Sequence, residues 1–166
     1  MHSISLYPAI ATVHSISRRV NSTKKLQIRA MRAVVQRVDS ASVEVDGRVV
    51  SKIGPGLLVL VGLHESDADY ICRKVLNMRL FPNDNTGKGW DLNVMQRNYS
   101  VLLVSQFTLY GVLKGNKPDF HVALPPLKAK PFYESLVDKF RKAYQSDAIK
   151  VTMQLDSAQP SNAEES

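Results

Sequence analysis

The chain has 166 residues, of which 44% are hydrophobic and 22% charged, and this suits a single folded domain with a buried core. It contains no apolar run of the roughly 18 residues that a transmembrane helix needs, so no membrane partner is expected. Cys72 is the only cysteine, which excludes a disulfide within the chain and argues against a cysteine-based zinc site.

The formal net charge is +7, a value that favours a nucleic-acid partner. Most of this charge lies in residues 1–30, which contain five basic residues and no acidic one. Residues 31–166 contain 17 basic and 15 acidic groups, a net of +2, so RNA contact there should be local. The five basic residues of the first segment are Arg18, Arg19, Lys24, Lys25 and Arg29.

The composition divides the chain into three parts. Residues 1–30 are Ser-rich and basic, which is typical either of a mitochondrial or plastid transit peptide or of a disordered extension. A folded domain is expected over 31–156, beginning at Met31, and a disordered tail over 157–166. The expected location is the cytoplasm, with a mitochondrion or plastid as the alternative if residues 1–30 act as a leader.

The first half of the domain reads as four strands and a helix. A helix should begin near Asp67, with Ser66 as its cap, and should end before Pro82. The turn-rich residues 83–90 predict a loop. The four strands, indicated by β-branched residues, partial alternation and one continuous apolar run, are 32–38, 40–46, 48–53 and 57–63.

The second half reads as a strand over 101–109, a Gly- and Pro-rich loop over 111–126, a helix from about Lys130 to Gln145 and a strand over 149–155. Pro131 suits the first turn of that helix. The element order predicts a single α+β domain with two main helices and a mostly antiparallel sheet that closes like a barrel.

Four consecutive residues, Ser105-Gln106-Phe107-Thr108, interrupt the most strand-like run of the chain. One interpretation is a strand whose polar end caps a neighbouring loop. The other is a ligand pocket at a strand end, where a hydroxyl and an amide offer directional hydrogen bonds. Thr108 could serve as a nucleophile only with an activating base, and the sequence displays none beside it. A Ser-His-acid triad stays open, since triads are recognised by geometry rather than spacing.

The next loop combines Lys114 and Lys117 with Phe120 and His121. Basic groups beside aromatic rings suit single-stranded RNA, through phosphate contacts and base stacking. An ordinary solvated loop anchored by one Phe explains the same residues equally well.

Together these stretches resemble the D-aminoacyl-tRNA deacylase family. The similarity rests on MRAVVQRV (31–38), VSQFTLYG (104–111), GNKPDFH (115–121) and the helix after the prolines at 125–126. It extends from Met31 to about Lys150, which is almost the whole expected domain.

The resemblance implies a homodimeric, barrel-like enzyme that hydrolyses the ester joining a D-amino acid, or glycine, to the terminal adenosine of tRNA, without a metal or organic cofactor. Ser105, Gln106, Phe107 and Thr108 would be the catalytic stretch, with backbone amides of 105–107 stabilising the oxyanion. Thr108 would be the nucleophile, or the 2′-hydroxyl of the tRNA would assist water. The substrate-binding residues would be Phe120, packed near the adenine, and Lys114 and Lys117.

The chain departs from the family at its carboxyl end. The family has an Asn-x-Gly-Pro-Val-Thr motif whose Gly-Pro acts as the chiral gate in the partner's site, whereas here Val151-Thr152 directly follows Lys150. This chain does contain the dipeptide Gly54-Pro55, but it lies between the expected strands 48–53 and 57–63, far from the carboxyl end. An internal deletion at the Lys150–Val151 junction explains this, and it predicts a chain that is unstable or has little D-selective activity.

Three alternatives therefore remain open at the level of sequence. The first is an inactive or RNA-binding-only splice product that lacks the gate. The second is a general single-strand RNA-binding module. The third is a small-molecule esterase that uses Ser105 or Thr108.

Overall fold

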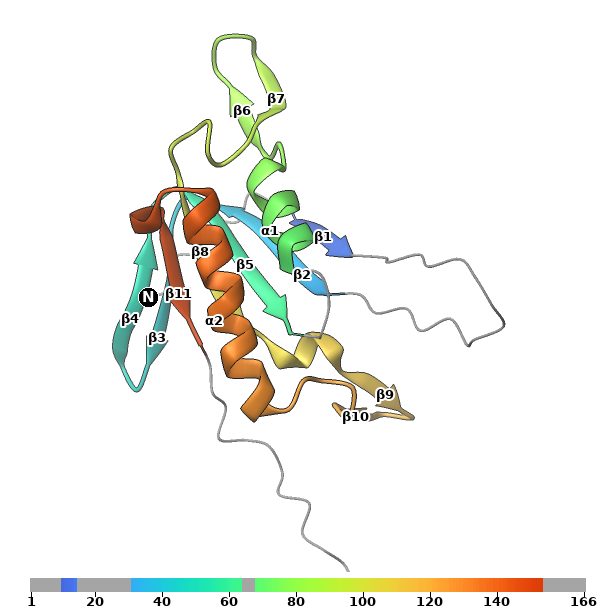
Figure 1. The fold of residues 1–166 in the computed structure, drawn as a ribbon. Helices are drawn as coiled ribbons and strands as arrows, with labels where there is room; N and C mark the ends of the chain where they lie inside the picture. The colour runs from blue at the N-terminus through green and yellow to red at the C-terminus, as the bar shows by residue number, and fades with distance from the viewer. Residues whose placement is uncertain (1–9, 15–30, 64–67, 154–166) are drawn as a thin grey trace, which may run out of the picture.

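The computed structural model describes residues 10–14, 31–63 and 68–153. They form an α+β domain, as predicted, with two helices packed on one face of a central sheet (Figure 1). The helices are α1 (Ala68–Asn77) and α2 (Pro126–Ala143). Two short 3₁₀ turns are also present: η1 (Phe107–Tyr110) follows β8, and η2 (Ser146–Ala148) follows α2.

The central sheet has five strands in the order β1-β2-β5-β8-β11. The β5–β8 and β8–β11 pairs are parallel, and the other described pairs are antiparallel. A closed barrel is not confirmed, because β1 and β11 are the two edges of this sheet. The strands are β1 (Ile10–His14), β2 (Arg32–Val38), β5 (Gly56–Gly62), β8 (Ser100–Ser105) and β11 (Ile149–Thr152).

Three hairpins surround this sheet. One packs near the face opposite the helices, and the other two project from opposite ends of the molecule (Figure 1). They are β3–β4 (Ala41–Val45 and Arg48–Ile53), β6–β7 (Phe81–Asn83 and Lys88–Leu92) and β9–β10 (Val112–Lys114 and Lys117–Asp119).

The strand β8 is buried on both faces, which explains why its sequence is continuously apolar. Val101 and Leu103 face the helices, whereas Leu102 and Val104 face Ile53 of the β3–β4 hairpin. Parallel strands covered on both sides read as apolar runs rather than as alternation, and this is what residues 101–104 show.

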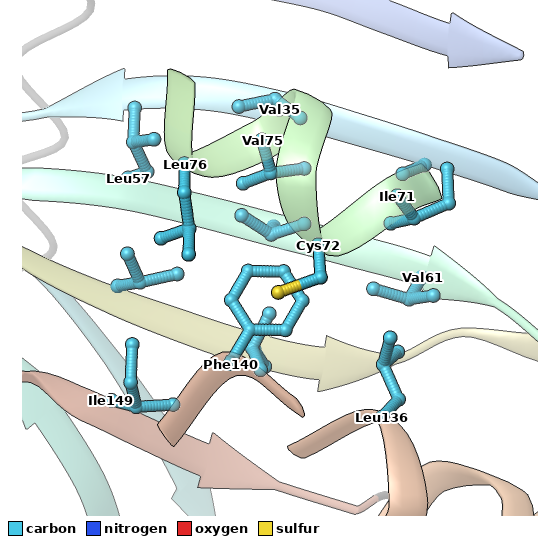
Figure 2. Packing of buried hydrophobic residues seen from close by; sticks show 14 of the residues in the cluster. Val35, Leu57, Val61, Ile71, Cys72, Val75, Leu76, Leu136, Phe140 and Ile149 are labelled. Atoms are coloured by element: carbon cyan, nitrogen blue, oxygen red, sulfur yellow. The ribbon is translucent and has the colours of Figure 1, made fainter. Parts of the chain in front are cut away.

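The main core fills the space between the two helices and the sheet. Phe140 of α2 is fully buried and points toward Cys72 of α1 (Figure 2). Removing a buried ring of this kind costs about 3–5 kcal/mol. Cys72 is a small buried hydrophobe, as predicted, and burial raises the pKa of its thiol to about 11, so the thiol stays protonated at neutral pH.

The structure corrects four expectations about elements. The loops predicted over 83–90 and 111–126 each contain hairpin strands. The strand predicted over 101–109 ends at Ser105 and is followed by η1. The second helix begins at Pro126, so Pro131 lies inside it rather than in its first turn. Pro131 is tolerated there because the carbonyl that loses its partner belongs to Leu127, which is 93% exposed and therefore accessible to water.

The strand β1 was not predicted, because residues 1–30 were read as an extension by composition alone. It pairs antiparallel with β2 from Ile10↔Gln36 to His14↔Arg32. The rest of that extension, the expected Ser66 cap and the tail over 157–166 lie outside the described residues.

Candidate active site

The polar stretch after β8 begins where two parallel strands end together. Ser105 is the last residue of β8 and pairs in register with Val61 of β5. The amide of Gln106 then donates to the Val61 carbonyl at 2.8 Å, and the chain turns into η1. In sheets with parallel strands, ligands bind in the crevice outside the carboxyl ends of the strands. This edge of the sheet is therefore a candidate ligand site. Ser105 itself is only 7% exposed.

The turn η1 is fixed by Arg32 at the start of β2. The backbone amide of Arg32 donates to the Tyr110 hydroxyl at 3.1 Å, and its guanidinium donates to the Leu109 carbonyl at 2.8 Å. The same guanidinium lies 5.1 Å from the centre of the Tyr110 ring. Burial raises the pKa of Tyr110 to about 12, so the hydroxyl remains an intact donor and acceptor.

Two glycines allow the aromatic rings to approach. A Cβ on Gly62 would lie 2.8 Å from Cε2 of Tyr110, and a Cβ on Gly111 would lie 2.8 Å from Cε1 of Phe120. Both separations are too short for real atoms, so these positions need glycine for packing rather than for a special backbone angle.

Phe107 and Phe120 form the apolar wall of the candidate site. Their ring centres are 5.3 Å apart, with an angle of 69° between the planes, the edge-to-face geometry that aromatic pairs prefer. Both rings are half-buried, so part of each faces solvent. The structure thus brings Phe120 of the GNKPDFH stretch beside Phe107 of the Ser105–Thr108 stretch.

Thr108 is exposed, and its Oγ1 accepts a hydrogen bond from Nε2 of Gln106 at 2.5 Å. An amide N–H is a donor and cannot remove a proton, so this contact orients the hydroxyl without activating it as a nucleophile. Gln106 and Thr108 therefore act as one polar unit beside the phenylalanine pair.

The β9–β10 hairpin holds the two predicted lysines. Lys114 forms an ion pair with Asp119, and Asp119 also accepts hydrogen bonds from the His121 amide at 2.9 Å and its ring Nδ1 at 2.8 Å. Lys114 and the His121 contacts hold the pKa of Asp119 well below its ordinary range. Lys117 faces Lys114 in the register and is exposed. The ion pair neutralises much of the charge of Lys114, so Lys117 is the better candidate for a phosphate contact.

Sequence reasoning missed the residues that support the site: Arg32, Gly62, Tyr110, Gly111 and Asp119. Gly111 directly follows the aromatic-rich turn 107–110, which was a readable signal for that glycine, whereas nothing in the sequence around Gly62 indicates its contact with Tyr110. The Arg32 contacts span 77 and 78 positions along the chain, and no local pattern indicates them.

Gly54-Pro55 lies at the amino-terminal ends of β5 and β8, opposite the candidate site. Pro55 precedes β5, and its carbonyl accepts from the Ser100 amide, at the start of β8, at 3.2 Å. Ser105 is at the other end of β8, so Gly54-Pro55 cannot reach the candidate site within one chain.

The described residues contain no group of three His, Cys, Asp or Glu side chains placed to hold a metal ion. None of the helices in the described part is long and apolar enough to cross a membrane.

A sequence profile described as D-Tyr-tRNA(Tyr) deacylase matches residues 34–157, about three quarters of the chain. The chain belongs to this deacylase family. Family members are named for a hydrolase activity on D-aminoacyl-tRNA.

Named relatives agree with this assignment. A D-aminoacyl-tRNA deacylase of Dictyostelium discoideum is 45% identical over 124 residues, covering 72% of this chain and 82% of the relative. D-aminoacyl-tRNA deacylase 1 of Homo sapiens is 49% identical over 124 residues, covering 72% of this chain but 59% of the relative. The chain therefore spans less than two thirds of the length of that mammalian relative.

Solved structures give the same fold. A structure titled c-Myc DNA Unwinding Element Binding Protein aligns with a TM-score of 0.68 and 48% identity, covering 72% of this chain and 82% of the other. A probable eukaryotic D-amino acid tRNA deacylase aligns with a TM-score of 0.59 at 18% identity, covering 68% of each chain, and this supports the fold alone.

Proposed function

We propose that this chain hydrolyses the ester bond between a D-amino acid, or glycine, and the terminal adenosine of tRNA. This reaction removes mirror-image residues before they enter translation. The observation that carries the proposal is the convergence of Ser105–Thr108 with the Phe107–Phe120 pair at the shared carboxyl edge of β5 and β8.

In the proposed reaction, a hydroxyl group of the tRNA itself assists the attacking water, which releases the amino acid and leaves the terminal ribose with a free hydroxyl. The adenine packs against Phe120, and backbone amides near residues 105–107 stabilise the negative charge on the carbonyl oxygen as water attacks. The 2′-hydroxyl of the terminal ribose assists this water. Thr108 does not attack, since its Oγ1 accepts a hydrogen bond from the Gln106 amide and, within the described residues, contacts no base.

A tRNA ending in 2′-deoxyadenosine and carrying D-tyrosine on its 3′-hydroxyl tests this route. We expect the deoxy substrate to be hydrolysed at least tenfold more slowly than the ribose form, while Thr108→Val retains most of its activity. Equal rates on the two substrates, together with an inactive Thr108→Val chain, would instead favour Thr108 as the nucleophile.

We propose further that this chain discriminates poorly between D- and L-aminoacyl groups. The two mirror images carry the same chemical groups, so selectivity needs rigid contacts around the chiral carbon. The family's Gly-Pro gate supplies such a contact, and this sequence lacks the motif that carries it.

We also propose that the chain forms a homodimer like that of the family. Sedimentation of the purified chain at several concentrations tests this.

The selectivity test is an assay of the purified 166-residue chain on D-Tyr-tRNA, L-Tyr-tRNA and Gly-tRNA. The expected result is hydrolysis of the D and L substrates at rates within about tenfold of each other, a difference in barrier of about 1.4 kcal/mol. Full D-selectivity would contradict the role given to the missing gate.

A variant of the site provides a second test. Gln106→Ala should lose activity, whereas Gly89→Ala, where an added Cβ meets nothing within 4 Å, is the matched control and should keep it.

The alternative function is RNA binding without chemistry, and Lys117 carries it. If the chain binds tRNA but hydrolyses none of the three substrates, this alternative is favoured. Lys117→Gln should then weaken binding and reduce its salt dependence by about one phosphate contact, because each contact releases counterions.

A further inference from the structure

A second candidate ligand site lies at the opposite end of the sheet from Ser105. A pocket of about 290 Å³ is lined by residues from β2, β6 and the segments that precede β5 and β8. Tyr99 immediately precedes β8, and Ser105 at the end of that strand is six residues further on, about 20 Å away at about 3.3 Å per residue. The lining residues are Arg37, Val38, Asp39, Pro55, Phe81, Pro82, Arg97 and Tyr99.

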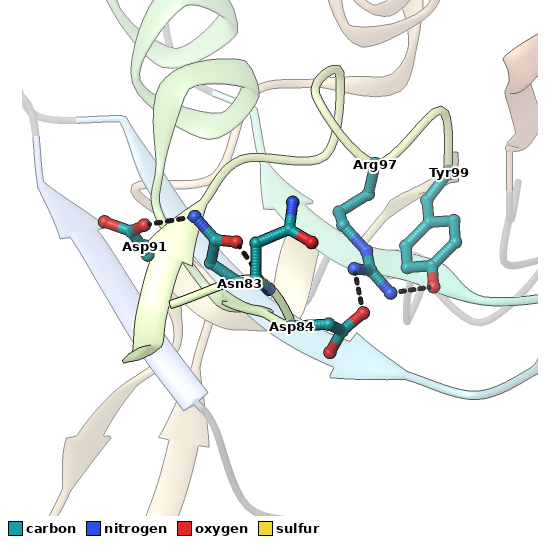
Figure 3. Close-up of polar contacts among 6 residues, drawn as sticks. Asn83, Asp84, Asp91, Arg97 and Tyr99 are labelled. Carbon is teal, nitrogen blue, oxygen red and sulfur yellow. Dashed lines mark hydrogen bonds and ion pairs between the residues drawn. The ribbon is translucent and has the colours of Figure 1, made fainter. Parts of the chain in front are cut away.

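The two guanidinium groups of this pocket are held in place and keep further donors. Arg37 donates through Nη1 to the Leu80 carbonyl at 2.8 Å. Arg97 donates through Nη1 to Asp84 and through Nη2 to the Tyr99 hydroxyl, both at 2.8 Å (Figure 3). A guanidinium has five N–H donors, so these bonds fix the two groups without using all their capacity. Guanidinium forks match a phosphate group. Asp84 offsets much of the charge of Arg97 in their ion pair, so Arg37, which contacts a neutral carbonyl, supplies most of the attraction for the phosphate.

The backbone helps to position Arg97. Asn98 adopts φ +54°, in the left-handed region that Asn tolerates better than most residues. This turn brings Arg97 back over the ring of Tyr99, with Cζ 5.1 Å from the ring centre. The Arg97 side chain is 23% exposed, so it is partly shielded from water, which strengthens its interaction with an anion.

The other lining residues suit the rest of a nucleotide. Tyr99, Pro55 and Pro82 give the pocket its accessible apolar surface, whereas Phe81 is only 3% exposed and packs edge to face against Tyr99 with ring centres 5.3 Å apart. Such walls accept a flat base. Asp39 places one carboxylate at the same pocket, which can accept hydrogen bonds from ribose hydroxyls or a base amino group. The volume is near the lower limit of roughly 300 Å³ for small-molecule pockets, the size for one nucleotide rather than a longer ligand.

We propose that this pocket binds a single nucleotide, with its phosphate on Arg37 and Arg97 and its base against Tyr99 and Pro82. The nucleotide is either a free nucleoside monophosphate or one residue of an RNA strand. The site is separate from the one proposed for deacylation and does not depend on hydrolysis.

Calorimetry on the full 166-residue chain tests the proposal with AMP, adenosine, inorganic phosphate and the trinucleotide CCA as probes. AMP should bind at least tenfold more tightly than either adenosine or phosphate, because only AMP engages both halves of the pocket. If CCA binds at least tenfold more tightly than AMP, and this affinity is lost in Arg37→Gln but not in Gln106→Ala, the nucleotide belongs to an RNA strand. Absence of binding by both AMP and CCA would overturn the proposal.

Variants locate the binding. Arg37→Gln should weaken AMP at least tenfold, and Arg37→Lys should recover part of the loss. Asp39→Asn provides a second probe of the pocket that leaves both guanidinium groups in place, and circular dichroism verifies that each variant folds. Arg79→Gln is the control, because Arg79 is an exposed arginine of the same region that does not line the pocket.

The outcome also separates this site from the deacylase site. If Gln106→Ala abolishes AMP binding while Arg37→Gln leaves it unchanged, the nucleotide binds beside Thr108 and the proposal is wrong. If Arg37→Gln abolishes AMP binding while D-Tyr-tRNA hydrolysis is retained, the two sites are independent and both proposals stand.

Discussion

Thr152 presents a polar atom that its surroundings do not satisfy. Within the described part of the chain, its Oγ1 is the buried side-chain atom without a hydrogen-bond partner. The neighbouring backbone is well satisfied, since the Tyr133 hydroxyl lies 2.8 Å from the Leu103 carbonyl and 3.0 Å from the Thr152 carbonyl. The buried hydroxyl of Thr152 therefore reduces stability, because it has lost water and gained nothing in return.

Thr152→Val should raise the free energy of unfolding by about 1 kcal/mol, because valine has the same shape and no group to desolvate. Urea denaturation followed by circular dichroism measures the change. Tyr133→Phe is the opposing control and should be destabilising, since it removes the hydroxyl that contacts both carbonyls. A loss of stability in Thr152→Val would mean that Oγ1 has a partner in solution.

Asp119 gives a pH-dependent prediction. Its folded pKa is depressed by Lys114 and by the two His121 contacts, so the carboxylate stabilises the β9–β10 hairpin. This stabilisation is complete above the unfolded pKa of about 3.9 and is lost as the pH falls through the lower folded value. We expect the carboxyl carbon of Asp119 to titrate in NMR with a midpoint clearly below 3.9. In Lys114→Gln, the midpoint should rise toward 3.9, and an unchanged midpoint would exclude the ion pair as the cause.

At the scale of elements, Gly111 controls the approach of the β9–β10 region to η1. A Cβ at this position would meet Cε1 of Phe120 at 2.8 Å and the Thr108 carbonyl at 3.1 Å. Gly111→Ala should therefore displace the Phe120 ring and lower kcat/KM for D-Tyr-tRNA about tenfold or more, while α1 and α2 keep their packing. Steady-state kinetics and circular dichroism check the two parts of this prediction.

Gly89→Ala is the matched control for Gly111→Ala. It lies in β7, and an added Cβ would meet nothing within 4 Å, so activity should be unchanged. If both alanine variants have wild-type activity, the position of Phe120 does not limit the reaction.

Elements were predictable from the sequence where the signal is local. The apolar run of β5, the Asp46-Gly47 turn of β3–β4 and the helical spacing within α2 each depend on neighbouring residues, and all three elements formed. The hairpins β6–β7 and β9–β10 were missed because Gly and Pro are read as loop residues, although Gly87 and Gly115 supply the positive φ that their turns use.

The candidate site was predictable only in part, for a related reason. Ser105–Thr108 and Phe120 stand out because polar residues at a strand end and aromatics beside lysines are local patterns. Their contact depends on Arg32 and on two glycines that allow close packing, and these relations are set by the three-dimensional arrangement. The ion pair of Lys114 was missed likewise, because the folding of the β9–β10 hairpin is what brings Asp119 to it.

At the scale of the whole molecule, β1 covers the edge of β2 along five register pairs. A chain that starts at Met31 would expose this edge and would also lose five positive charges of the net +7. An open edge and a net charge nearer zero both favour association. We expect light scattering to show self-association of this shortened chain at lower concentration than for the full chain.

Proline variants separate the edge from the charge. Thr12→Pro and Val13→Pro remove backbone donors from β1 while the full charge of +7 remains. If one of them associates like the shortened chain, the uncovered edge is the cause. If neither differs from the full chain while the shortened chain associates, the loss of charge is responsible.

The strand β11 contains residues from both sides of the Lys150–Val151 junction. Ile149 and Lys150 precede it, Val151 and Thr152 follow it, and all four pair with β8 in unbroken register. The strand pairing is therefore continuous across the junction. We expect the four residues to open together, so that their amide hydrogens exchange at similar rates. In a longer chain with residues inserted at this point, the inserted segment would have to continue the ladder from Lys150. The exchange protection of Val151 and Thr152 would thus differ between this chain and such a longer chain, even though both carry the same Ser105–Thr108 stretch.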